Sequence, residues 1–161
     1  MVSNSSGTIA LLITVLVGLS LQIFPLPDSL EWWRPSLLLM TMIYWVMALP
    51  NRVGIVTCWV IGLVLDVSLG NHLGIHGATF AICAYIVLSL NKRLRLFTLL
   101  QQSVFIALLV GFDLVISLWI ENFIDYRVRS AAYWLPILSS TLVWPISFIL
   151  LRHIRRSYHI R

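Results

Sequence analysis

Six apolar runs, separated by short polar breaks, most constrain what this chain can fold into. A helix needs about 20 mainly apolar residues to cross a bilayer. Four of the runs are near that length, and the second and fourth are shorter. Of the 161 residues, 60% are hydrophobic and 11% are charged, whereas a soluble domain is about a quarter charged. We therefore predict an all-α membrane protein, a polytopic bundle of six transmembrane helices that forms a single integral membrane domain over residues 1–161. The expected spans are approximately 8–24, 35–49, 53–69, 77–90, 98–120 and 133–151.

The breaks between the runs differ in chemistry. Residues 25–36 contain three prolines and the Trp32–Trp33 pair, which is typical of a loop at the membrane–water interface. Gly70–Gly77 predicts a turn, and Arg152–Arg161 predicts a short basic tail. Pro145 predicts a kink in the last helix. The second and fourth runs are short, so five spans with one re-entrant segment is an alternative that the sequence leaves open.

Positive charges gather on one side of the predicted bundle. Six helices put both termini on the same side, and the segments on that side contain eight Lys and Arg residues and no acid. These bases, the basic rim, are Arg52, Lys92, Arg93, Arg95, Arg152, Arg155, Arg156 and Arg161. Because cytoplasmic segments are rich in Lys and Arg, we expect the rim and both termini to be cytoplasmic. The asymmetry explains the net charge of +5 without a nucleic-acid partner. The expected partner of the rim is the lipid bilayer, whose anionic headgroups contribute about 1 kcal/mol per basic residue.

The third run carries glycines and one carboxylate at helical spacing. Gly62, Asp66, Gly70 and Gly74 fall four residues apart, so they share one face for as far as the helix lasts. Small residues let a second helix approach closely, and a carboxylate in an apolar interior needs a partner or a watery cavity. We predict that these four residues, the glycine strip, form a helix-packing face. We also hypothesise that a partner protein's membrane helix binds there.

Asp66 and Asp113 are the two acids within the predicted spans. Asp66 lies 13 residues beyond Val53, and Asp113 lies 12 beyond Gln101, which places both carboxylates about 18–20 Å from the inner side. Both helices run outward, so the two carboxylates lie at similar depth and are able to share a site. One interpretation is structural, with each aspartate bonding a neighbouring backbone group, a hydroxyl or an outer-loop base. The candidate bases are Arg34, Arg127, His72 and His76. The other interpretation is a small polar cavity that opens outward, because ionisable groups within a membrane are functional candidates.

The sequence contains few patterns that are typical of a catalytic site or a metal site. An intramembrane aspartyl protease needs two carboxylates on two helices, but the contexts VLDVSLG and GFDLVIS do not match that class. His72 and His76 have a metal-binding spacing only if a helix continues through this glycine-rich segment, which indicates a loop instead. Cys58 and Cys83 lie in apolar runs and are interpreted as buried thiols. We predict that the chain is not an enzyme and has no catalytic, cofactor-binding or metal site, and no cofactor.

Two segments carry a resemblance to a known family. RPSLLLMTMIYWVMALPNRVG covers Arg34–Gly54, and GLVLDVSLGNHLGIHG covers Gly62–Gly77. In order, their motifs are Arg-Pro, Tyr-Trp, Leu-Pro-x-Arg-Val and Gly-x3-Asp-x3-Gly-x2-Leu-Gly. The stretch Leu21–Asp28 and the Trp144–Pro145 pair fit as well. With these motifs the chain resembles the rod shape-determining protein MreD family, in its proteobacterial branch.

The resemblance implies a multi-pass protein of a bacterial cell inner membrane, which agrees with the orientation expected from the charges. It implies a non-enzymatic scaffold of the rod-shape or elongation complex, which couples cytoplasmic MreB filaments to periplasmic peptidoglycan synthesis. MreC is the first expected partner, followed by MreB, RodZ and the elongation-type RodA/penicillin-binding protein synthase, and a homo-oligomer is also allowed.

The family is also similar in architecture to the substrate-binding membrane subunits of vitamin transporters. The alternative function is therefore the membrane substrate-binding subunit of a transporter for a small molecule or a lipid intermediate. Its pocket would lie at the level of Asp66 and Asp113.

Overall fold

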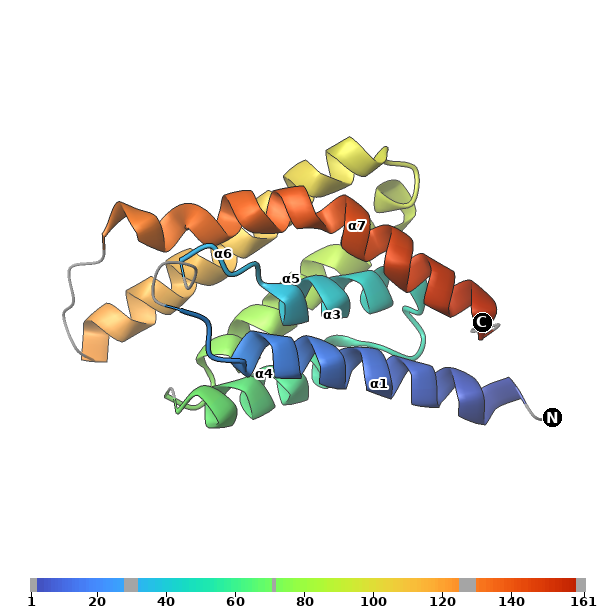
Figure 1. The fold of residues 1–161 in the computed structure, drawn as a ribbon, viewed down its shortest axis with the longest axis horizontal. Helices are drawn as coiled ribbons and strands as arrows, with labels where there is room; N and C mark the ends of the chain where they lie inside the picture. The colour runs from blue at the N-terminus through green and yellow to red at the C-terminus, as the bar shows by residue number, and fades with distance from the viewer. Residues whose placement is uncertain (1–2, 28–31, 71, 125–129, 159–161) are drawn as a thin grey trace.

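The structure is all-α. A computed structural model describes residues 3–27, 32–70, 72–124 and 130–158. Within these residues the chain forms six α-helices, one short 3₁₀ helix and no strand, so the predicted all-α bundle of six helices is confirmed. The elements are α1 (Ser3–Ile23), α3 (Leu37–Ala48), α4 (Ile55–Leu69), α5 (Ile75–Leu94), α6 (Leu99–Ile124), η1 (Ala131–Trp134) and α7 (Leu135–Ser157). Helix α1 begins and helix α7 ends at the same end of the bundle (Figure 1).

Helix α3 is the buried centre of the bundle. It contacts α1, α5 and α7, and every residue from Leu38 to Met47 is buried. Its sequence is apolar on all sides, which is the pattern of a helix enclosed by others. The indole Nε1 of Trp45 donates a hydrogen bond of 2.9 Å to Thr14 Oγ1, which fixes α3 against α1. With 12 residues, α3 is about 18 Å long and does not by itself match the ~30 Å hydrocarbon core of a bilayer.

The outer surface of the bundle is apolar. Three helices are long and apolar enough to cross a membrane, at Ile75–Leu94, Leu99–Phe123 and Ala131–Ser157. Three shorter apolar helices cover Gly7–Ile23, Leu37–Ala48 and Ile55–Leu69. Large apolar side chains on the outside, among them Val56, Leu100 and Leu142, are more than two-thirds exposed. A soluble protein of this size rarely exposes so much apolar surface. These faces are therefore suited to contact lipid acyl chains.

Several helices are longer than the sequence predicted. Helix α5 continues to Leu94, and α7 continues to Ser157, so the expected basic tail is helical over residues 152–157. Lys and Arg are good helix formers, and positive charge in a last turn interacts favourably with the helix dipole. The predicted Gly70–Gly77 turn is also shorter, because Ile75 already begins α5.

Helix α7 contains Pro145 in its interior. A proline removes one backbone donor and crowds the preceding turn, which bends a helix rather than ending it when neighbours support both halves. Figure 1 shows that α7 changes direction along its length.

Candidate functional site

Gly62 permits an unusually close contact between α4 and α5. These two helices make the most extensive contact in the bundle. A Cβ atom at position 62 would lie 2.5 Å from the His76 carbonyl oxygen and 2.7 Å from the Gly77 nitrogen. Both neighbours are backbone atoms, so they do not move aside as a flexible side chain would. Only glycine therefore lets the first turn of α5 approach α4 this closely.

The reversal between the two helices depends on two further glycines. Gly70 ends α4 with φ +67°, and Gly74 precedes α5 with φ +102°. Both values lie in the left-handed region, which glycine adopts without steric cost. Because Gly74 has no side chain, it does not cap α5 itself, and the first amides of α5 need an acceptor from elsewhere.

Asp66 supplies that acceptor. Its carboxylate accepts hydrogen bonds from the backbone amides of Gly74 at 2.9 Å, His76 at 3.1 Å and Gly77 at 3.3 Å. The His76 ring adds a fourth contact, Nδ1 to Oδ1, at 2.7 Å. The Asp66 side chain is completely buried, and negative charge is favourable at a helix N-terminus. Asp66 is thus the cap of α5, provided by α4.

Asp113 lies on the other side of the same turn. Its side chain is buried, and the Thr79 hydroxyl contacts its Oδ1 at 2.5 Å. Thr79 follows His76 by three residues, so both lie on one face of α5. The structure therefore brings the two aspartates to opposite sides of one helical turn, linked through His76 and Thr79. The sequence predicted similar depth for both but did not identify Thr79, because a single threonine inside an apolar run does not indicate which buried group its hydroxyl contacts.

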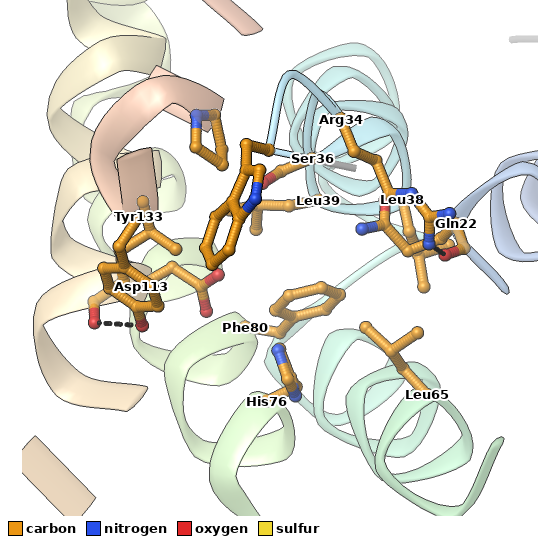
Figure 2. Close-up of a pocket in the computed structure, with 13 residues that line it drawn as sticks. Gln22, Arg34, Ser36, Leu38, Leu39, Leu65, His76, Phe80, Asp113 and Tyr133 are labelled. Atoms are coloured by element: carbon orange, nitrogen blue, oxygen red, sulfur yellow. Dashed lines mark hydrogen bonds between the residues drawn. The ribbon is translucent and has the colours of Figure 1, made fainter. Parts of the chain in front are cut away.

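A cavity of about 450 Å³ opens beside this network. Figure 2 shows Asp113 and Tyr133 at one side of it, Arg34 and Gln22 at the other, and Phe80 and His76 between them. The polar lining residues come from α1, α5, α6, η1 and the segment before α3, all at the end of the bundle opposite the chain termini. Leu38, Leu39 and Leu65 form much of its apolar wall. The cavity thus has a cationic group and a carboxylate separated by apolar and aromatic surface.

Arg34 is held by the end of α1 rather than by an aspartate. Its Nη1 donates to the Gln22 carbonyl at 2.6 Å, and its Nη2 donates to the Phe24 carbonyl. The last carbonyls of a helix lack partners within it, and a cation there is favourable. Of the four bases proposed as aspartate partners, His76 is the one that pairs with Asp66, and Arg127 lies outside the described residues.

Comparison with known proteins identifies the family. The family model described as rod shape-determining protein MreD matches residues 3–154. The rod shape-determining protein MreD of Haemophilus influenzae is 33% identical over 144 residues, which cover 87% of this chain and 86% of that protein. The chain belongs to the rod shape-determining protein MreD family. The resemblance drawn from the motifs is therefore confirmed, and the chain is a membrane protein of a rod shape-determining family.

No solved structure matches the chain. The likeness of the MreD family to the membrane subunits of vitamin transporters therefore stays an expectation.

Part of the glycine strip of this MreD-family chain packs against another helix of the same chain. Gly62 and Asp66 face α5 and are buried, whereas Gly70 and Gly74 lie in the turn between the two helices. The four residues therefore do not form one continuous helical face, because the helix ends at Leu69. The expected helix packing occurs, but its occupant is α5. At Gly62 and Asp66 the surface is covered by α5, whereas a Cβ at Gly70 or Gly74 would meet nothing within 4 Å. That another protein's helix binds the strip stays a prediction.

The described residues of the basic rim lie at the opposite end of the bundle from the Asp113 cavity. Arg95 follows α5, and Arg152, Arg155 and Arg156 lie in the last turns of α7. Lys92 and Arg93 lie in the last turn of α5, Arg52 lies between α3 and α4, and Arg161 is outside the described residues. Arg95 is anchored, because its Nη2 donates to the Met47 carbonyl at 2.9 Å and its Nε donates to Asn91 Oδ1 at 3.0 Å.

The thiols and histidines add no further site to the described part of the MreD-family chain. Cys58 and Cys83 are buried free thiols, as interpreted from the sequence. Among the residues described, no three His, Cys, Asp or Glu side chains gather as metal ligands would.

Proposed function

We propose that this chain is a non-enzymatic inner-membrane scaffold of the rod-shape complex, which couples cytoplasmic MreB filaments and MreC to periplasmic peptidoglycan synthesis. The observation that carries the proposal is the MreD family match over residues 3–154. The arrangement of Asp66 supports a structural role for the most buried acid, since its carboxylate is engaged by three amides and one imidazole. RodZ and the RodA/penicillin-binding protein synthase complete the proposed assembly.

The proposed orientation places both termini in the cytoplasm. The described residues of the basic rim lie at the end where α1 begins and α7 ends, and the positive-inside rule assigns that end to the cytoplasm. The Asp113 cavity would then open toward the periplasm. An impermeant thiol reagent that labels a Ser157→Cys variant from the outside of intact spheroplasts would contradict this orientation.

Partner proteins would contact the membrane-embedded faces of this chain. The described connections between helices are short, so they leave little surface outside the bilayer. The α4 face that carries Gly62 is covered by α5. We therefore expect MreC to pack on outward apolar side chains of the bundle, where van der Waals contacts and interhelical hydrogen bonds drive association.

The scaffold role predicts stable co-purification with elongation proteins. We expect affinity purification of the full-length chain, after brief crosslinking in its own cells, to recover MreC, with RodA and its penicillin-binding protein in smaller amounts. Depletion of the chain is expected to make rod-shaped cells wider and rounder. An unrelated polytopic protein with the same tag and expression level is the control. Recovery of a transporter ATPase without MreC, together with normal cell width on depletion, would contradict the proposal.

A second candidate function is supported by the Asp113 cavity. Its volume of about 450 Å³ lies within the range of small-molecule sites, and its carboxylate favours a cationic or zwitterionic ligand. If the chain is a substrate-binding subunit, thiamine, as a cationic vitamin, should raise its melting temperature in detergent. The rise should disappear in Asp113→Asn and persist in Ser68→Ala, whose side chain is exposed on α4. Equal melting temperatures with and without thiamine count against this ligand class.

A further inference from the structure

A second cavity, of about 230 Å³, lies at the basic end of the bundle. Its lining comes from α3, α6, α7 and the residue that follows α5. Three of the lining residues are arginines, namely Arg95, Arg152 and Arg155, and none is an acid. Met47, Ala48 and Phe148 supply an apolar side. A cavity lined by three guanidinium groups and apolar side chains is chemically suited to bind an anion that also carries an apolar group.

Among the described residues, no acidic side chain lines this cavity. The buried ion pair of Asp66 with His76 lies at the other end of the bundle. The chain has six acids, and none of them lies in the sequence segments that bracket the cavity. Arg152 and Arg155 are three residues apart on α7, so their like charges share one face. A bound anion would relieve this repulsion.

Two buried polar groups at the cavity lack partners. Tyr44 is 2% exposed and Gln102 is 5% exposed, yet the Tyr44 hydroxyl and Gln102 Oε1 have no hydrogen-bond partner among the described residues. Gln102 Nε2 is already used, because it donates to the carbonyls of Leu94 and Phe97. Buried polar atoms are nearly always bonded. The Tyr44 hydroxyl is able to donate to an anionic oxygen, and Gln102 Oε1 is able to accept from a hydroxyl.

We propose that this cavity binds the headgroup of an anionic phospholipid. The guanidinium groups of Arg95, Arg152 and Arg155 hold the phosphate, the Tyr44 hydroxyl donates to one of its oxygens, and Gln102 Oε1 accepts from a headgroup hydroxyl. Phosphatidylglycerol has both a phosphate diester and glycerol hydroxyls, so it fits these donors and acceptors. The apolar side formed by Met47, Ala48 and Phe148 favours a lipid over free phosphate. This inference needs the membrane location of the chain and does not depend on the scaffold role.

Binding of short-chain lipids to the delipidated full-length protein in mild detergent tests the proposal. We expect dioctanoyl phosphatidylglycerol to bind and to raise the melting temperature, and dioctanoyl phosphatidylcholine and inorganic phosphate to do so much less. At about 1 kcal/mol per arginine, with 1.4 kcal/mol for each tenfold, the Arg152→Gln/Arg155→Gln variant should bind phosphatidylglycerol roughly 30-fold more weakly. Arg156→Gln is the matched control, because Arg156 is exposed on the same helix and does not line the cavity.

A second variant separates the site from a general charge effect. Tyr44→Phe removes only the unpartnered hydroxyl, so without lipid the protein should melt at the same or a higher temperature. Its affinity for phosphatidylglycerol should fall about tenfold, the effect of one hydrogen bond to a charged group. Undiminished binding by both the double-arginine variant and Tyr44→Phe would overturn the proposal. So would equal binding of phosphatidylcholine, and binding of inorganic phosphate as tight as that of the lipid would overturn the lipid assignment.

Discussion

Replacing Gly62 with alanine is expected to destabilise the folded chain by about 3 kcal/mol, at the upper end of what overpacking costs. The added methyl group would lie 2.5 Å from the His76 carbonyl oxygen and 2.7 Å from the backbone of Gly77. The first turn of α5 would have to move away from α4, and this movement would also draw the amides of His76 and Gly77 away from Asp66. Titration with SDS in mixed micelles measures the free energy of unfolding.

Gly111→Ala is the matched control for this substitution. Gly111 also lies within an apolar helix, but a Cβ there would meet only the Ile137 Cδ1 atom, at an ordinary distance of 3.5 Å. We expect Gly111→Ala to be neutral or to stabilise the chain by up to about 1 kcal/mol through helix propensity. Equal effects of the two substitutions would show that α4 and α5 do not pack as closely as the structure has them.

Replacing Asp66 with alanine is expected to cost about 3–5 kcal/mol, the usual result of removing one partner of a buried charged cluster. The substitution would leave the amides of Gly74, His76 and Gly77 and the His76 ring without their acceptor. Asp66→Asn should have an intermediate effect, because the amide group keeps one oxygen but turns an NH₂ toward donors. The same SDS titration measures both variants.

Ser68→Ala is the control for Asp66, since Ser68 is exposed and bonds only the Val64 carbonyl of its own helix. We expect its effect to stay within about 0.5 kcal/mol. The Asp66 variants should also accumulate less in the membrane and lose all partner contacts together. If an Asp66→Asn protein folds normally and loses only MreC while it keeps its other partners, Asp66 would instead belong to a surface that binds MreC.

Much of the fold was predictable because a bilayer limits a chain to few solutions. Apolar runs near the required length, bounded by Pro50, by Gly70 and by clusters of Lys and Arg, predict helices and their breaks. The predicted ends of the helices were less accurate. Basic residues such as Arg152 and Arg155 interrupt the apolar signal but not the helix, because they are good helix formers at a favourable end of the dipole.

The candidate site was predicted only in part. Helical spacing placed Gly62 and Asp66 on one face, and depth placed Asp113 near Asp66. The partner of Asp66 was one of several open choices, and Thr79 was not considered. The sequence predicted that the basic rim meets anionic headgroups. It did not predict that Tyr44 and Gln102 line a cavity with three of these arginines, since the lining residues come from four separate parts of the chain.

The sequence alone determined that this chain is a bundle of apolar helices with most of its Lys and Arg residues on one side, because length, hydropathy and charge are properties of each segment by itself. Only the tertiary structure decided that α5, and not a second protein, covers the face of Gly62 and Asp66. The physical reason is that helices in lipid are apolar on nearly every side, so periodicity does not distinguish a face packed on protein from one in contact with acyl chains. That choice depends on shape and on which buried donors find an acceptor, and both arise only when the helices pack together.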